Sequence, residues 1–177
     1  MLVIFLAAIY EKFGQDIPVD RLDSVFINTE EYFPEISDFL QLSIEEYKLA
    51  LVNLQIHDLK QGFTKYLNMK PKVKAIIVGI RKIDPYAKGL QSFQITDNNW
   101  PRFIRVNPIL NWEYDEIWFF LRKNKIKYCK LYDLGYTSIG GIHNTIKNPL
   151  LLKDGTEDEY FPAYCLEDKS KERLSRI

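Results

Sequence analysis

The first half of the chain alternates between helical and strand-like hydrophobic patterns, and this alternation restricts the possible folds more than any other feature. Short apolar runs predict strands within the ranges Leu22–Asn28, Lys48–Leu54 and Val73–Val78. Helical patterns stand before them, in Met1–Tyr10, from Pro34 onward, and in Asp58–Leu67. Helices that alternate with strands are typical of a parallel sheet covered by helices. We therefore expect one three-layer α/β domain over residues 1–177.

The range Met1–Tyr10 is almost entirely apolar. A signal peptide would have a basic start, which this run lacks. The run stops at Glu11, short of the roughly 20 apolar residues that a membrane span needs. We expect a helix that is buried on all sides and ends at Gly14, and no association with a membrane.

The second half has weaker periodicity and is rich in aromatic residues. Its first part, Ile80–Pro108, predicts a long loop, and loops of this length in compact domains are usually functional or disordered. A helix is predicted over Trp112–Lys123, and the charged tail Glu167–Arg176 is also expected to be helical.

Composition excludes several classes of function. The 24 basic and 24 acidic side chains cancel, which argues against nucleic acid as a partner. Two cysteines, Cys129 and Cys165, cannot form a disulfide framework in a chain of this length, so a cytoplasmic location is expected. His57 and His143 lack ligand spacing with either cysteine, so we predict no metal cluster.

The residues with the clearest chemistry follow the strongest predicted strand, where positions 79–85 read GIRKIDP. Ligands of parallel sheets bind beyond the carboxyl ends of the strands. Gly79 would let a ligand approach the backbone, Arg81 could hold a phosphate, and Asp84 could accept a hydrogen bond from a ring N–H. An Arg–Asp surface pair in an ordinary turn explains the same residues.

Further candidates lie downstream. Trp100, between Asn99 and Pro101, could stack on a flat ligand, although a tryptophan that anchors its loop is the simpler interpretation. Arg173 and Arg176 share a face if the tail is helical and could hold a phosphate, although a solvated helix is the simpler interpretation. The segment 131–141, LYDLGYTSIGG, could form an anion-binding nest or a tight turn.

Taken in order, these motifs resemble a known family. GIRKIDP at 79–85, RVNPILNW at 105–112, LYDLGYTSIG at 131–140 and ERLSR at 172–176 resemble the blocks of eukaryotic FMN adenylyltransferases, or FAD synthases, and most of all the fungal single-domain form. The wider superfamily contains the PAPS reductases, whose second-strand block resembles positions 26–35. Those reductases usually carry a reactive cysteine in a C-terminal Glu-Cys-Gly-Leu-His motif, which this sequence lacks.

The resemblance implies an activity and a set of roles. The activity is the transfer of AMP from ATP, with Mg²⁺, to FMN, which gives FAD and pyrophosphate. Asp84 would bind the edge of the flavin ring and Trp100 would stack on it. Arg173 and Arg176 would hold the FMN phosphate and serve as catalytic residues. The ATP site would be lined by Asn28, Gly79 and Arg81. A monomer is expected.

The sequence departs from the family at its start. The family's catalytic core begins with a strand and a Ser-x-Gly-Gly-Lys-Asp-like phosphate loop, and the apolar helix follows them. Met1 lies inside that helix, so the first strand and the phosphate loop are expected to be missing and the domain incomplete at its N-terminus. Two alternatives remain: a non-catalytic flavin- or nucleotide-binding remnant, and an enzyme related to the PAPS reductases.

Overall fold

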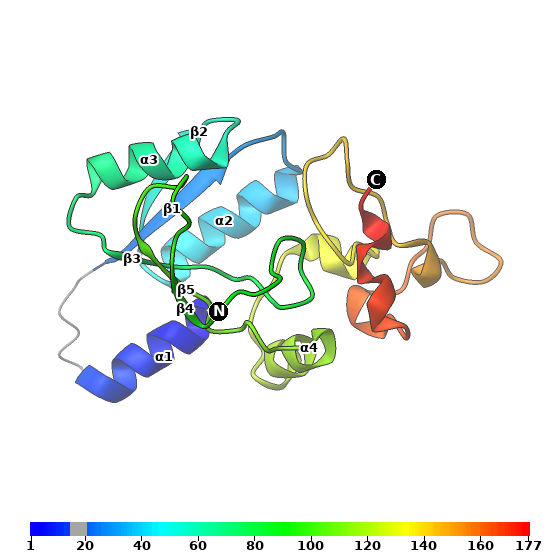
Figure 1. Ribbon diagram of the computed structural model, residues 1–177. Coiled ribbons are helices and arrows are strands. Elements are labelled where there is room, and N and C mark those ends of the chain that lie inside the picture. Colours follow the sequence, from blue (N-terminus) through cyan, green and yellow to red (C-terminus); the bar gives the residue numbers. More distant parts are fainter. Residues whose placement is uncertain (15–20) are drawn as a thin grey trace. The chain divides into compact units, whose positions relative to one another are not determined.

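The structure is a computed structural model that describes residues 1–14 and 21–177 (Figure 1). The chain forms two compact units. The sheet unit contains Met1–Thr29 and Tyr47–Trp112, and the C-terminal unit contains Glu30–Glu46 and Glu113–Ile177. Of the described helices, none is long and apolar enough to cross a membrane.

The sheet unit contains two small sheets. Strands β1 (Leu22–Asn28) and β2 (Leu49–Gln55) pair in parallel, in a register that places Leu22 opposite Leu49. The second sheet has the order β3-β5-β4. In it, β5 (Ile104–Val106) pairs in parallel with β3 (Ala75–Ile77) and antiparallel with β4 (Phe93–Ile95). The three predicted strands are confirmed, with β3 shorter than expected.

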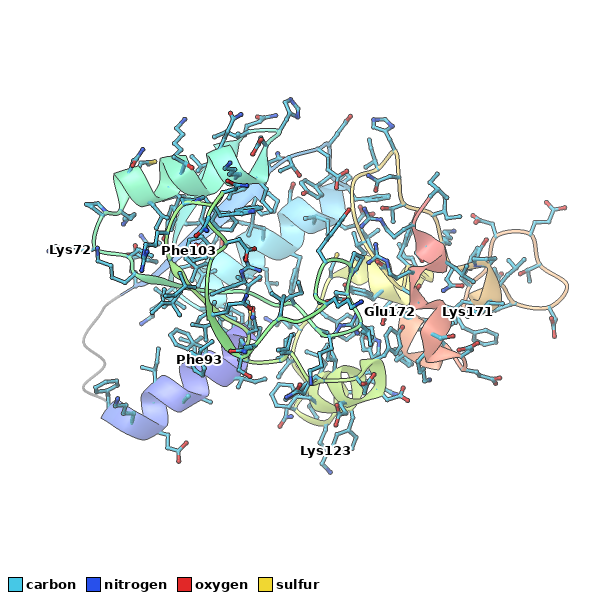
Figure 2. All side chains as sticks on the ribbon, viewed as in Figure 1. Lys72, Phe93, Phe103, Lys123, Lys171 and Glu172 are labelled. Atoms are coloured by element: carbon cyan, nitrogen blue, oxygen red, sulfur yellow. The ribbon has the colours of Figure 1, made fainter. Side chains whose placement is uncertain are left out.

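Strands β4 and β5 lie inside the range 80–108, for which the sequence predicted only a loop, so that prediction was wrong. Each has three residues, which is too short to show a repeating pattern. The two form a hairpin whose ends are tied by Thr96, since its N–H donates to the carbonyl of Phe103 at 3.0 Å. Phe103 is buried, whereas Phe93 on β4 is exposed (Figure 2).

Helix α1 (Leu2–Phe13) ends as predicted at Gly14, which has φ of +60° and donates its N–H to the carbonyl of Tyr10 at 2.8 Å. The expectation of burial on all sides was wrong, because none of its residues is buried. Leu2 and Phe5 line an open cavity, and Tyr10 is exposed to solvent.

Helix α3 (Leu59–Met69) packs against β1 and β2. Its N-cap is Asp58, whose side chain accepts a hydrogen bond from the N–H of Gln61 at 2.9 Å. Tyr66 is buried, whereas Leu59 is 45% exposed. Leu59 is the first residue of the helix, ahead of the turns that contact the sheet.

The C-terminal unit contains helices α2 (Pro34–Glu46) and α4 (Tyr114–Lys123). Its core surrounds Trp118, whose ring contacts Tyr128, Tyr132 and Tyr164 edge-on at centroid distances of 5.1, 5.4 and 5.8 Å. Four short 3₁₀ segments complete the unit: Lys130–Leu134, Pro149–Leu151, Ala163–Cys165 and Lys169–Ser175. The tail is therefore helical, but as a 3₁₀ helix.

Candidate functional site

The turn after β3 is built on an ion pair between Arg81 and Asp84. A guanidinium nitrogen of Arg81 lies 2.8 Å from Oδ1 of Asp84, and the backbone N–H of Arg81 donates to Oδ2 at 2.8 Å. Asp84 returns a hydrogen bond from its own N–H to the carbonyl of Arg81 at 3.0 Å. Arg81 is only 9% exposed, so this is a largely buried pair and not the surface pair that was the alternative.

Gly79 stands just before this turn, and the side chain of Met1 lies against it. A β-carbon at Gly79 would be 3.3 Å from Sδ of Met1, which is closer than most real contacts. Its φ angle is not in the left-handed region, so glycine is favoured here by close approach and not by backbone conformation. The group that approaches Gly79 in this structure is therefore the Met1 side chain.

Two asparagines stand at the ends of strands with a buried amide oxygen that lacks a partner among the described residues. Asn28 is the last residue of β1, and Asn107 directly follows β5. The Nδ2 of Asn107 donates to the carbonyl of Gln91 at 2.8 Å, but its Oδ1 receives no hydrogen bond. A buried acceptor without a donor is unfavourable, so both oxygens are suited to a ligand or water that donates.

Trp100 lies at the tip of the hairpin between β4 and β5. Its backbone N–H donates to the carbonyl of Asp97 at 2.9 Å, and its half-buried ring contacts Phe63 of α3 at a centroid distance of 6.2 Å. Phe63 in turn contacts the buried Phe103 at 5.3 Å. The ring of Trp100 thus anchors its loop to α3 and still keeps part of its surface exposed.

In the C-terminal unit, Arg173 and Arg176 belong to the last 3₁₀ segment, Arg176 as its C-cap. Arg176 caps the helix with an extended backbone, so the shared face predicted for these two arginines stays a prediction. Arg173 is exposed and Arg176 is half-buried. The guanidinium of Arg176 lies directly against Gly140, where any β-carbon would overlap it. Gly140 therefore leaves the space that the guanidinium of Arg176 occupies.

A buried polar network holds the segment that carries these arginines. Thr137 Oγ1 donates to the carbonyl of Glu172 at 2.5 Å, and its backbone N–H donates to Oγ of Ser175 at 3.0 Å. Asn148 donates from Nδ2 to Thr137 Oγ1 at 2.8 Å and to the carbonyl of Lys171 at 3.0 Å. Asn148 and Ser175 are fully buried. The network fixes the position of the last helix within its unit.

The two cysteines differ in their surroundings. Cys129 is buried, and its Sγ lies 3.6 Å from the carbonyl of Glu35. Burial raises the pKa of the Cys129 thiol, which disfavours the reactive thiolate. Cys165 is exposed. Residues 1–14 and 21–177 contain no group of three or more histidine, cysteine or carboxylate side chains that could hold a metal ion.

Comparison with known proteins assigns the chain to a family. The phosphoadenosine phosphosulfate reductase domain family matches residues 2–147. A probable FAD synthase of Schizosaccharomyces pombe is 40% identical over 181 residues, with 99% of this chain and 67% of the relative covered. The chain belongs to the FAD synthase family. The flavin adenine dinucleotide synthase of Saccharomyces cerevisiae, another relative in that family, is 36% identical, with 87% of this chain and 56% of the relative covered.

Solved structures of the FAD synthase family agree with this assignment. The crystal structure of Candida glabrata FMN adenylyltransferase in complex with FAD and inorganic pyrophosphate superimposes with a TM-score of 0.91 at 28% identity, and covers 99% of this chain and 75% of that one. The expected α/β fold of the PAPS reductase-like kind is thus confirmed. The chain spans about two thirds or less of its relatives in the FAD synthase family.

Some of the candidate site residues at the strand ends of this FAD synthase family member were predicted from the sequence. The structure pairs Arg81 with Asp84 and puts Asn28 at the end of β1, while the ligand roles predicted for these residues stay predictions. Asn107 was missed because β5 was not predicted. Had β5 been recognised, an asparagine directly after a strand would have marked Asn107 as a candidate. Thr137, Asn148 and Ser175 were missed because their partners are distant in sequence, 11 to 38 residues apart.

Proposed function

We propose that this chain is the larger part of an FMN adenylyltransferase, which transfers AMP from MgATP to FMN and releases pyrophosphate. The observation that carries the proposal is the 40% identity to an FAD synthase along nearly the whole chain. It is supported by the likeness to an adenylyltransferase structure that contains FAD and pyrophosphate.

The reaction requires positioning more than covalent participation of the protein. A phosphate oxygen of FMN attacks the α-phosphorus of ATP, a new P–O bond forms, and the bond to the β-phosphate oxygen breaks. Pyrophosphate leaves with the electron pair of that bond. The protein must therefore hold two anions in line and balance their charge. Mg²⁺ is proposed to arrive with ATP as part of the substrate, since Mg²⁺ is commonly bound through substrate phosphates.

The sheet unit offers groups suited to the two ring systems. Asn28 presents a buried acceptor that an adenine amino group or a ribose hydroxyl could satisfy. We assign Asn28, Gly79 and Arg81 to the nucleotide, and Asp84 to the N–H edge of the flavin. The carboxylate of Asp84 already accepts two hydrogen bonds, and a carboxylate has about four acceptor positions, so it can take another.

Trp100 is assigned to stacking on the flavin. Its partly exposed ring has one fixed neighbour, Phe63, so it is held in place before a ligand arrives. In the C-terminal unit, Arg173 and Arg176 are assigned to the FMN phosphate. Guanidinium groups are suited to this task because they bind phosphate with two parallel hydrogen bonds.

The test is to incubate the 177-residue chain with FMN, ATP and Mg²⁺ and to measure FAD by chromatography. FMN binding is measured in parallel by the quenching of tryptophan fluorescence. We expect saturable FMN binding together with FAD formation that needs all three reactants. Binding without any FAD would support the alternative of a non-catalytic flavin-binding protein, and failure of both would overturn the proposal.

A sulfonucleotide reductase is the less favoured alternative. A reductase cysteine must be reachable and reactive, whereas Cys129 is buried with a raised pKa. Cys165 is exposed but stands in the sequence AYCLED, not in the reductase motif. Thiol-dependent reduction of PAPS by the chain would restore this alternative.

Finally, we propose that the protein acts in the cytoplasm as a monomer, without nucleic-acid or membrane partners.

A further inference from the structure

The loop that carries Trp100 is closed by one buried threonine. Thr96 directly follows β4 and is 8% exposed. Its Oγ1 donates a hydrogen bond to the carbonyl of Pro101 at 2.8 Å and accepts one from the N–H of Phe103 at 3.2 Å. Its backbone N–H donates to the carbonyl of Phe103 at 3.0 Å. Thr96 therefore joins the two ends of residues 97–102, which we call the Trp100 loop.

The hydroxyl of Thr96 takes over a backbone role. Facing residues of an antiparallel pair that exchange hydrogen bonds do so from both backbone N–H groups to both carbonyls. Here Thr96 donates to the carbonyl of Phe103, whereas Phe103 donates in return to the hydroxyl. The same hydroxyl continues to Pro101, which belongs to the Trp100 loop. Its removal would leave a buried N–H and a carbonyl without these partners, which is unfavourable.

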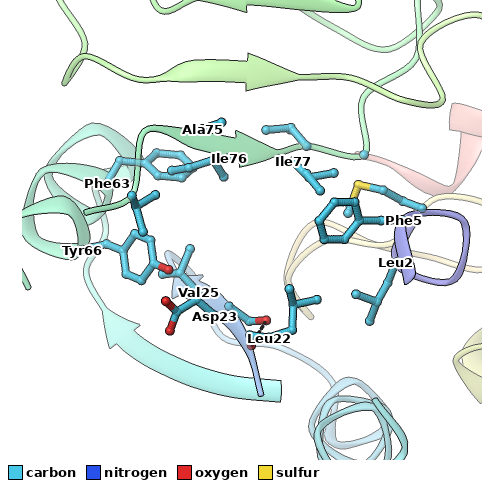
Figure 3. A pocket seen from close by; sticks show the side chains of 15 residues that line it. Leu2, Phe5, Leu22, Asp23, Val25, Phe63, Tyr66, Ala75, Ile76 and Ile77 are labelled. Atoms are coloured by element: carbon cyan, nitrogen blue, oxygen red, sulfur yellow. Dashed lines mark hydrogen bonds between the residues drawn. The ribbon is translucent and has the colours of Figure 1, made fainter. Parts of the chain in front are cut away.

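The ring of Trp100 lies against helix α3. It contacts Phe63 at a centroid distance of 6.2 Å, and Phe63 contacts the ring of Phe103 at 5.3 Å. Phe103 is also the residue that Thr96 binds. In Figure 3 the side chain of Phe63 extends from α3 toward β3, where it lines the open cavity together with Ile76. Phe63 is thus held by its neighbours, and the placement of Trp100 against it depends on the Trp100 loop.

A second link between the Trp100 loop and β5 is weaker. A guanidinium nitrogen of Arg105 lies 3.9 Å from Oδ2 of Asp97, which is beyond hydrogen-bond distance, and the Asp97 side chain is 70% exposed. Exposed ion pairs contribute little to stability. The N–H of Trp100 donates to the carbonyl of Asp97 at 2.9 Å, but both groups belong to the loop itself. The position of the loop on the hairpin therefore depends mainly on Thr96.

We propose that Thr96 is a positioning residue for flavin binding. Its hydroxyl fixes the Trp100 loop, so that the ring of Trp100 is placed for stacking before FMN arrives. A loop that is fixed in advance loses less conformational entropy when the ligand binds, which raises the affinity. This role rests on the stacking proposed for Trp100, and it requires that Thr96 influences FMN only through Trp100.

The first test compares two substitutions of Thr96 by FMN fluorescence. Thr96→Val keeps the shape of the side chain and removes its hydroxyl, whereas Thr96→Ser keeps the hydroxyl. The Kd for FMN should rise in Thr96→Val, by no more than the about three- to tenfold expected for the loss of the Trp100 ring. It should stay near the parent value in Thr96→Ser. Thr96→Ala makes the same deletion and takes the place of Thr96→Val if that variant does not fold.

A double-mutant cycle shows whether Thr96 acts through Trp100. In Trp100→Ala, the further change Thr96→Val should leave the Kd for FMN unchanged, because no ring remains to be placed. A purely structural role of Thr96 would instead lower the affinity by the same factor in both backgrounds. Such multiplying losses would overturn the proposal.

The order of the Trp100 loop is measured without any flavin. The indole N–H signal of Trp100 in a nuclear magnetic resonance spectrum is assigned by its loss in Trp100→Ala, and its relaxation gives an order parameter. This order parameter should fall in Thr96→Val and keep its parent value in Thr96→Ser. An unchanged order parameter in Thr96→Val would show that the hydroxyl does not hold the loop, which overturns the proposal.

The two measurements separate the role of Thr96 from the proposed function. If the parent chain does not bind FMN, the proposed function fails, and the role of Thr96 toward flavin fails with it, whatever the order of the loop. If the parent chain binds FMN and Thr96→Val binds it equally well, only the role of Thr96 fails.

Thr156→Val is the matched control. The Oγ1 of Thr156 donates to the carbonyl of Lys153 at 2.9 Å and lies 3.3 Å from that of Glu159, so it closes a loop of the C-terminal unit in a similar way. This variant should leave the FMN affinity and the order parameter of Trp100 unchanged. A loss of affinity equal to that of Thr96→Val would show that loosening any loop has this effect, and would overturn the proposal.

Discussion

At the residue scale, the pair of Arg81 and Asp84 prepares the turn after β3 before any ligand is present. Oδ1 of Asp84 accepts a hydrogen bond from the side chain of Arg81, and Oδ2 accepts one from the backbone N–H of Arg81. The side chains are 11% and 22% exposed, so water competes weakly for them. Fixing both groups in advance reduces the entropy that binding must overcome.

Replacement of Asp84 should therefore weaken both the fold and flavin binding. Asp84→Asn removes the charge that Arg81 faces, and we expect a loss of about 1.5–3 kcal/mol in the free energy of unfolding. Urea denaturation of Asp84→Asn, Arg81→Gln and the double variant measures the coupling, which should be about 1–3 kcal/mol. FMN affinity should fall in Asp84→Asn. Additive effects on stability would contradict a direct pair.

Trp100→Ala should weaken FMN binding by about three- to tenfold, because a stacking contact contributes about 0.5–1.5 kcal/mol beyond its buried area. Trp100→Phe should recover part of the affinity, since it keeps a flat ring. FMN fluorescence measures both. Phe119→Ala, at an exposed aromatic of α4, serves as the control and should bind normally. Unchanged FMN affinity in Trp100→Ala would show that Trp100 only anchors its loop, through its contact with Phe63.

Tyr128 should make stability depend on pH in the alkaline range. Burial, followed by its hydrogen bond to Asp133, raises the pKa of Tyr128 to about 12. The Tyr128 side chain loses this proton near pH 10 in the unfolded chain. The stabilisation that the protonated side chain gives the folded protein is therefore complete below pH 10 and is lost as the pH rises toward 12. Melting temperatures between pH 9.5 and 11.5 should fall less steeply in Tyr128→Phe than in the parent. The exposed Tyr86→Phe is the control, and equal slopes in all three proteins would contradict the prediction.

At the element scale, the sequence predicted those strands that lie within an apolar run of four or more residues or show a long pattern. Strands β1 and β2 have seven residues each and were found, and the three residues of β3 were found because they lie in the unbroken apolar run 75–78. Strands β4 and β5 also have three residues each, but a polar residue interrupts each of them, and they were missed. Helix α1 was found but its burial was not, because burial depends on which groups surround the helix and not on its own sequence. The Arg81–Asp84 turn was located from sequence because its two residues are only three apart. The network around Asn148 was not located, because its partners are 11 and 23 residues away in the sequence.

That network makes Asn148 the residue on which the last 3₁₀ segment most depends. Asn148→Ala removes two donated hydrogen bonds and the acceptor for the N–H of Leu150, so we expect a loss of about 1–3 kcal/mol in stability. Flavin phosphate binding should weaken too, because Arg173 and Arg176 would be held less firmly. Urea unfolding and FMN titration measure the two effects. Asn144→Ala, which removes a half-buried bond to Glu30, is the matched control and should have the smaller effect.

At the scale of the whole molecule, the path of the chain bears on whether the two compact units are separate domains. The chain passes between them at Thr29–Glu30, at Glu46–Tyr47 and at Trp112–Glu113. Independent domains are usually joined by one linker where few contacts cross. The chain therefore passes three times between the two units, and the single domain predicted over residues 1–177 stays a prediction that unfolding can test.

A single domain should unfold in one cooperative transition. Trp100 belongs to the sheet unit and Trp118 to the core of the C-terminal unit, so each reports on one unit. In each variant that keeps only one of these tryptophans, with phenylalanine at the other two positions, the urea midpoint by fluorescence should equal the midpoint by circular dichroism, which reports on the whole chain. Two separate midpoints would show that the units are independent domains. Because a ligand stabilises every part of a cooperative unit equally, FMN should then raise the fluorescence midpoint and the circular-dichroism midpoint of any one variant by the same amount.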